Sequence, residues 1–129
     1  MTDAQVTDGA LLAAADAIAA CAYAPYSSFD VGCALLTRDG KVVEGVNVEN
    51  AAYPLGICAE RAAFSRAIAM GYRPGDFVAV AITASPCGGC RQWLLEMGVE
   101  RVVFRNDENV VTMRPDELLP ESFTAADLR

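Results

Sequence analysis

The chain has 129 residues, of which 53% are apolar and 21% are charged, and its formal net charge is −7. This length suits one ordinary domain, so we expect residues 1–129 to form a single domain. The acidic balance provides no counterion release on DNA or RNA, which disfavours a nucleic-acid partner and favours a small, uncharged ligand. No apolar run reaches the roughly 18 residues that span a bilayer, and acidic residues lie where a signal peptide would be positive. We therefore expect a cytoplasmic protein without a membrane partner.

The first part of the chain predicts a helix followed by a hairpin. Residues 8–22 have apolar side chains at helical spacing, and Asp8 is a candidate N-cap. Residues 29–36 are an apolar run of strand length, and an Asp-Gly turn signal separates them from the alternating residues 42–49. We expect these two strands to pair antiparallel.

The remaining sequence alternates helices with strands. One helix is predicted to begin at Cys58 and to end at Gly71, and another to begin near Cys87 and to end at Gly98. The order predicts an α/β fold with a mixed sheet of about five strands flanked by helices. Further strands are expected at residues 77–82, 101–105 and 109–113, and a short helical turn at residues 116–119.

Two cysteine clusters carry the strongest chemical signal. Cys58 stands alone, Cys87 and Cys90 form a C-x-x-C pair, and the chain contains no histidine. Both clusters lie at predicted helix starts, where unpaired N–H groups and the helix dipole stabilise thiolates, which are zinc ligands. Three protein ligands leave one position for water, as in catalytic zinc sites. The sequence therefore predicts one Zn²⁺ held by these three cysteines.

Charged residues beside the clusters are candidates for supporting roles. Glu60 is one residue removed from a ligand and is the candidate proton carrier. Arg61 and Arg91 are suited to donating hydrogen bonds to the sulfurs, and the alternative for both is a solvated helix arginine. Cys21 and Cys33 have no partner at ligand spacing, so we interpret both as packing residues.

The end of the second predicted strand carries a candidate sugar-binding pair. The period of two along a strand places Asn47 and Glu49 on the same side. An amide donates and accepts while a carboxylate accepts hydroxyl protons, so the pair suits a diol such as ribose. A solvated strand end is the default interpretation for this pair alone, and only the neighbouring metal motif favours binding.

Five segments together resemble one enzyme family. C-x-E followed by P-C-x-x-C is the zinc-deaminase signature. In chain order, these segments are similar to the small cytidine deaminases of pyrimidine salvage, over nearly the whole chain. The segments are residues 26–32 (YSSFDVG), 47–53 (NVENAAY), 58–61 (CAER), 85–92 (SPCGGCRQ) and 118–123 (LLPESF).

The resemblance implies a three-layer α/β hydrolase that assembles as a homotetramer, with active sites at the subunit contacts. It implies that one zinc per subunit is held by Cys58, Cys87 and Cys90. The implied reaction is hydrolysis of cytidine and 2′-deoxycytidine to uridine and 2′-deoxyuridine, with release of ammonia. In that family a zinc-bound hydroxide attacks the ring, and the proton shuttle corresponds to Glu60 here.

The resemblance also implies which residues contact the nucleoside. Asn47 and Glu49 correspond to the residues that hold the ribose, and Phe29 to the one that faces the pyrimidine ring. Tyr53 and Phe123 match positions that complete a neighbouring subunit's pocket. Ala59 is a further expected substrate contact.

Three other interpretations stay open from the sequence. A blasticidin-type deaminase shares the C-A-E and S-P-C-G-x-C-R-Q segments, although residues 47–53 favour the ribose binder. A zinc-stabilised scaffold without turnover would need a fourth ligand and no adjacent carboxylate. A nucleic-acid editing deaminase is disfavoured by the acidic charge and by the lack of a basic, aromatic-lined segment.

Overall fold

The computed structural model describes residues 6–129, in which two strand pairs and a single strand are separated by helices. Short 3₁₀ turns occur at Tyr53–Leu55 and at Ala125–Leu128. The other elements, in chain order, are α1 (Asp8–Ala19), β1 (Gly32–Thr37), β2 (Val42–Val46), α2 (Ala59–Ala69), β3 (Phe77–Ile82), α3 (Gly88–Met97), β4 (Arg101–Asn106), β5 (Asn109–Met113) and α4 (Pro115–Leu118). No helix within residues 6–129 is long and apolar enough to cross a membrane.

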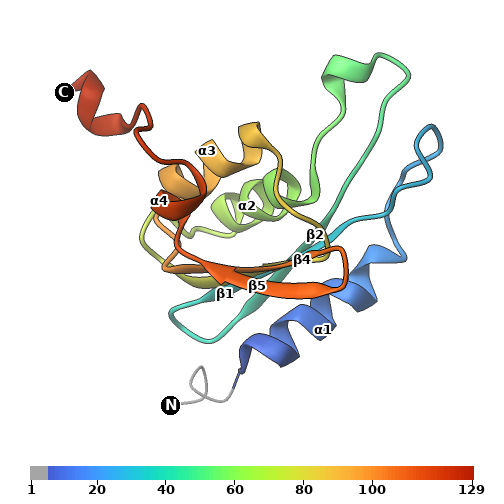
Figure 1. The fold of residues 1–129 in the computed structure, drawn as a ribbon, viewed down its shortest axis with the longest axis horizontal. Coiled ribbons are helices and arrows are strands. Elements are labelled where there is room, and N and C mark those ends of the chain that lie inside the picture. The colour runs from blue at the N-terminus through green and yellow to red at the C-terminus, as the bar shows by residue number, and fades with distance from the viewer. Residues whose placement is uncertain (1–5) are drawn as a thin grey trace.

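The strands of residues 6–129 form one mixed five-stranded sheet in the order β2-β1-β3-β4-β5. β1 is antiparallel to β2 and to β3, β3 is parallel to β4, and β5 is antiparallel to β4. Helix α1 covers one face, and α2 and α3 cover the other, which gives three layers (Figure 1). The predicted α/β fold with a mixed sheet and flanking helices is confirmed.

Alternation along β1 divides the core between the two faces of the sheet. Cys33 and Leu35 pack in the cluster beneath α2 and α3, whereas Ala34 and Leu36 pack beneath α1. β3 occupies the middle of the sheet and is buried on both faces, as its continuous apolar run predicts. The buried central strands thus form the base on which α2 and α3, the helices that carry the three clustered cysteines, are packed.

A glycine allows α2 to lie directly on β2. A Cβ at Gly45 would come within 2.4 Å of the backbone nitrogen of Ala63 and within 2.7 Å of the carbonyl oxygen of Ala59. Backbone contacts that close exclude any side chain at this position. The close approach therefore fixes the first turn of α2, which carries Cys58 and Glu60, against the sheet.

Three predictions about α1 and Cys21 are wrong: the N-cap, the end of the helix and the burial of Cys21. Thr7, not Asp8, is the N-cap, because the Thr7 hydroxyl accepts a hydrogen bond from the backbone N–H of Ala10 at 3.0 Å. Asp8 is instead the first helical residue and pairs with Arg101 at 2.9 Å. The helix ends at Ala19, before the predicted end, so Cys21 is exposed rather than packed.

Candidate active site

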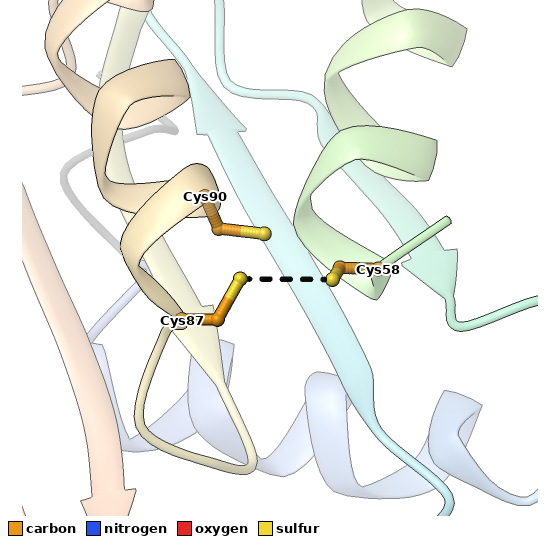
Figure 2. A group of neighbouring side chains, drawn as sticks. All are labelled: Cys58, Cys87 and Cys90. Atoms are coloured by element: carbon orange, nitrogen blue, oxygen red, sulfur yellow. Dashed lines mark hydrogen bonds between the residues drawn. The ribbon is translucent and has the colours of Figure 1, made fainter. Parts of the chain in front are cut away.

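Three cysteines meet where α2 and α3 begin. Cys58 and Cys87 are the N-cap residues of α2 and α3, and Cys90 lies in the first turn of α3. Their sulfurs point toward one another from the two helix starts (Figure 2). The three Sγ atoms lie within 4.8 Å of one another, and those of Cys58 and Cys87 are 3.9 Å apart.

This spacing fits a zinc ion. Tetrahedral zinc with bonds of about 2.3 Å to sulfur places its sulfur ligands about 3.8 Å from one another. Within residues 6–129, the cluster contains no fourth cysteine, histidine or carboxylate ligand. Cys58, Cys87 and Cys90 therefore form a zinc site with three thiolate ligands, which leaves a coordination position for water.

Hydrogen-bond donors around Cys58 favour its thiolate. A hydrogen bond from the Cys90 thiol, with further ones from Arg61 and Cys87, lowers the pKa of Cys58 to about 5. The Nη2 atom of Arg61 lies 3.7 Å from the Cys58 sulfur. Arg61 thus makes the sulfur contact that its place in the sequence predicts, and its charge offsets part of the negative charge of the thiolates.

Glu60 lies beside the metal site in a buried position. It is the second residue of α2, and 3% of its surface is exposed. Burial raises the pKa of Glu60 to about 7, and the negative charge of Cys58 adds to this effect. A carboxyl group whose pKa lies near neutral can both take up and release a proton at physiological pH.

A cavity of about 390 Å³ opens at the carboxyl end of β3 beside these residues. Its volume falls in the range of small-molecule sites. It brings together most of the residues predicted to form the site: Phe29, Asn47, Glu49, Tyr53, Cys58, Ala59, Glu60, Arg61 and Cys87.

Asn47 and Glu49 lie just after the end of β2, and their side chains hydrogen-bond to the backbone of the loop that precedes β1. The Oδ1 atom of Asn47 accepts a hydrogen bond from the N–H of Val31, and its Nδ2 atom donates to the carbonyl of Phe29, both at 2.8 Å. Glu49 accepts from the N–H of Tyr26 at 2.9 Å. Hydrogen bonds around Glu49 lower its pKa, with the hydroxyl of Ser27 contributing most. The pair therefore shapes the cavity wall on which Phe29 lies.

Three of the predicted site residues do not line this cavity: the buried ligand Cys90, and Arg91 and Phe123. Arg91 donates to the carbonyl of Pro86 at 2.8 Å and to that of Leu118 at 3.0 Å. Among the described residues it makes no hydrogen bond to a sulfur, because its guanidinium reaches backward to the turn before Cys87 and across to α4. Phe123 is 60% exposed, and its carbonyl accepts from Gln92 at 2.7 Å.

With this geometry established, comparison with known proteins gives the family. The family model described as the cytidine and deoxycytidylate deaminase zinc-binding region matches residues 6–106. The chain belongs to this family. The matched range includes both helix starts and all three cysteines of the zinc site.

Curated members of the cytidine deaminase family are similar over most of this chain. A cytidine deaminase of Halalkalibacterium halodurans is 44% identical over 116 residues, which cover 83% of this chain and 86% of the relative. A cytidine deaminase of Mycobacterium tuberculosis is 43% identical over 116 residues, covering 85% and 84%. The crystal structure of cytidine deaminase from Burkholderia pseudomallei superposes with a TM-score of 0.85 at 48% identity, covering 91% of this chain and 99% of that one.

Sequence reasoning did not assign a role to several residues at the deaminase cavity. Ile57, Ala84 and Ser85 line it, and Tyr26 and Ser27 bind Glu49 from its edge. No local pattern distinguishes the lining residues, because the loops that carry them meet only in the folded chain. Ser27 had a weaker signal, since a serine hydroxyl can bond the backbone two residues further on, as Ser27 does with the N–H of Phe29.

Proposed function

We propose that the chain hydrolyses cytidine and 2′-deoxycytidine to uridine and 2′-deoxyuridine, releasing ammonia, in cytoplasmic pyrimidine salvage. The observation that carries this proposal is a buried carboxyl group beside an open three-cysteine zinc site, in a cavity that also contains an amide and a carboxylate. Family membership and a cavity of about 390 Å³ support a nucleoside-sized substrate. We also propose that residues 1–129 form a single domain.

In this proposal Glu60 performs the proton transfers. Cys58, Cys87 and Cys90 would hold a zinc ion, which would supply a Lewis acid that makes water easier to ionise near neutral pH. Glu60 takes up the proton released by that water and passes it to N3 of the pyrimidine, which makes C4 more electrophilic. After the water oxygen bonds to C4, Glu60 takes up the proton of the new hydroxyl group and gives it to the amino nitrogen, so that the C4–N bond breaks and ammonia leaves. Burial suits Glu60 to this cycle, because it places the pKa of the carboxyl near 7.

The opposite wall orients the nucleoside. Asn47 and Glu49 bind the sugar hydroxyls, and the ring of Phe29 covers the base. All three residues line the same cavity as Cys58 and Glu60, which supports simultaneous contact with the sugar and the reacting ring. Binding energy from the sugar then positions C4 at the metal.

Direct hydrolysis assays test the substrate. We expect the zinc-loaded protein to convert cytidine and 2′-deoxycytidine with comparable efficiency, measured by the loss of ultraviolet absorbance. Deoxycytidylate and blasticidin S, assayed in parallel, represent the other specificities of the superfamily. If the zinc-loaded protein converts none of the four compounds, the scaffold interpretation is favoured. If it converts deoxycytidylate or blasticidin S preferentially, that compound replaces cytidine as the proposed substrate.

We also propose that the chain assembles as a homotetramer with active sites at the subunit contacts. Large apolar side chains around the cavity support this assembly, because Tyr53 is 74% exposed and Leu55 is 69% exposed in the single chain. Tyr53 also stacks at a tilt on Tyr26, with ring centroids 5.9 Å apart. Sedimentation equilibrium should give four chains per particle, and a monomer with full activity would contradict the proposal.

A further inference from the structure

Ser27 hydrogen-bonds to Glu49 and to Phe29, the two residues that we propose contact the sugar and the base of the nucleoside. Its hydroxyl donates a hydrogen bond to Oε2 of Glu49, and the same hydroxyl oxygen accepts one from the backbone N–H of Phe29 at 3.0 Å. The backbone N–H of Ser27 donates to Oε1 of Glu49 at 3.1 Å. One side chain therefore bonds both to the carboxylate proposed for the sugar and to the residue proposed for the base.

The hydrogen-bonding capacity of these groups fixes the direction of each bond. A serine hydroxyl has one proton, and Ser27 gives it to Glu49, which leaves a lone pair for Phe29. An ionised carboxylate offers about four acceptor positions. In Glu49, donors from Tyr26 and Ser27 fill three of them. Acceptor capacity thus remains for a sugar hydroxyl, on a carboxylate that its neighbours hold in place.

Hydrogen bonds rather than packing hold this loop. The side chain of Phe29 is 62% exposed, so the core does not fix the ring. Both main-chain polar groups of Phe29 are nevertheless bonded, the N–H to Ser27 and the carbonyl to Asn47. Ser28, between them, has a φ of 59°, in the left-handed region that a side chain disfavours. The bonds on either side keep the backbone in this conformation.

We propose that Ser27 is a positioning residue that couples sugar recognition by Glu49 to the placement of Phe29 over the base. This inference rests on the proposed function, because it assumes that both groups touch a nucleoside. Ser27 itself touches neither the metal cysteines nor the reacting ring; it acts through its two partners. The coupling predicts that losing one hydroxyl weakens recognition of the sugar and of the base together.

Substitution of Ser27 on the zinc-loaded enzyme tests the coupling. We expect Ser27→Ala to raise KM for cytidine by roughly ten-fold or more, the loss typical of a hydrogen bond to a charged group, with a smaller change in kcat. We expect Ser27→Thr, which keeps the hydroxyl, to restore KM to near the wild-type value. Ser65→Ala makes the same chemical change at an exposed position on α2 and should alter neither constant.

A second substrate separates positioning from general loosening of the fold. The ratio of kcat/KM for cytidine to that for 2′,3′-dideoxycytidine measures the contribution of the sugar hydroxyls. In Ser27→Ala this ratio should fall several-fold, whereas a merely less stable enzyme would keep it. If Ser27→Ala does not fold, the same ratio can be measured in Ser27→Cys. This substitution keeps a side chain of similar size but replaces the hydroxyl with a thiol, which is a weak hydrogen-bond donor.

The outcomes distinguish this inference from the proposed function. If the wild-type protein deaminates cytidine but Ser27→Ala has wild-type KM and an unchanged ratio, the coupling is wrong and the function stands. An equal loss in Ser27→Thr and Ser27→Ala would likewise contradict a role for the hydroxyl. If the wild-type protein converts no nucleoside, the proposed function itself fails, whatever Ser27 does.

Discussion

Glu49 and Glu60 line the same cavity, yet the protein places them in opposite environments. Glu60 is buried at a helix start beside thiolates, and burial raises its pKa to about 7. Glu49 lies in a loop, where hydrogen bonds from Ser27 and Tyr26 lower its pKa. Two carboxyl groups whose environments push their pKa values apart are suited to different tasks. Glu60 can exchange protons, whereas Glu49 stays charged and accepts hydrogen bonds.

The region around Glu60, where α2 and α3 begin, and the loop region around Glu49 are also stabilised by different interactions. The helix-start region rests on the buried sheet through Gly45, and its cysteines and Glu60 lie on regular elements. The loop region, residues 26–31 with Asn47 and Glu49, is largely exposed and depends on hydrogen bonds between its backbone and the side chains of Asn47 and Glu49. Mutations in the first region should therefore change the chemistry, and mutations in the second should change binding.

Removal of a metal ligand should break the helix-start region most completely. We expect Cys90→Ser to lose bound zinc and all measurable turnover, because a hydroxyl is a far weaker zinc ligand than a thiolate. Metal analysis and the cytidine assay on the same preparation check this result. Cys21→Ser is the matched control, since Cys21 is exposed and outside the cluster. A Cys90→Ser protein with one zinc per chain and normal turnover would contradict the assignment.

Removal of the proton carrier should separate chemistry from metal binding. We expect Glu60→Gln to lower kcat by roughly 10² to 10⁴, the usual contribution of general acid and base catalysis, while zinc content stays the same. Steady-state kinetics with metal analysis measure both quantities. Near wild-type kcat in this variant would exclude Glu60 as the shuttle.

The corresponding change in the loop region should act mainly on binding. We expect Glu49→Gln to raise KM for cytidine by roughly ten-fold to a hundred-fold, because the sugar hydroxyl loses a charged acceptor. Its kcat should fall much less than that of Glu60→Gln. If kcat fell as far and KM stayed constant, the division of labour between the two glutamates would be wrong.

Asp39 provides a hydrogen-bonded carboxylate outside both regions, and its loss should have the smallest effect. The hydroxyl of Thr37, and to a smaller extent that of Tyr72, donate hydrogen bonds that lower the pKa of Asp39. The ionised carboxylate therefore contributes its whole share to the free energy of unfolding at any pH above the ordinary carboxyl pKa. That contribution disappears as the pH falls through the lowered pKa of the folded state. We expect Asp39→Asn to lower Tm by a few degrees at pH 7, progressively less in acid, with unchanged kinetics. A Tm difference that grew in acid would contradict this linkage.

The helix-start region could be predicted from sequence because its signals are local. Cys58 and Cys87 lie at the helix starts as predicted, and Gly98 ends α3 with a φ of 66°. The continuous apolar run of β3 likewise placed it in the middle of the sheet. Each of these signals depends on only a few neighbouring residues: the cysteine spacing, the glycine that ends the helix and the run of apolar residues. Here all three predict the same arrangement of helices and strands.

The loop region could be predicted only in part, because its contacts join distant residues. The second strand was expected to continue to Glu49, but β2 ends at Val46, and Val48 instead makes isolated bridges to Tyr23 and Ile57. Sequence spacing also could not show that Arg91 binds carbonyl groups, since its acceptor on α4 is 27 residues away. The end of β2 and the partners of Arg91 depend on which loops come into contact after folding.

Titration of zinc into the metal-free protein, with cytidine turnover followed at each addition, tests the central claim most directly. The three-cysteine site with Glu60 beside it predicts that activity rises linearly and saturates at one zinc per chain, and that Glu60→Gln binds the same zinc with almost no turnover. Cytidine turnover by the metal-free protein, or activity that needs more than one zinc per chain, would contradict the claim.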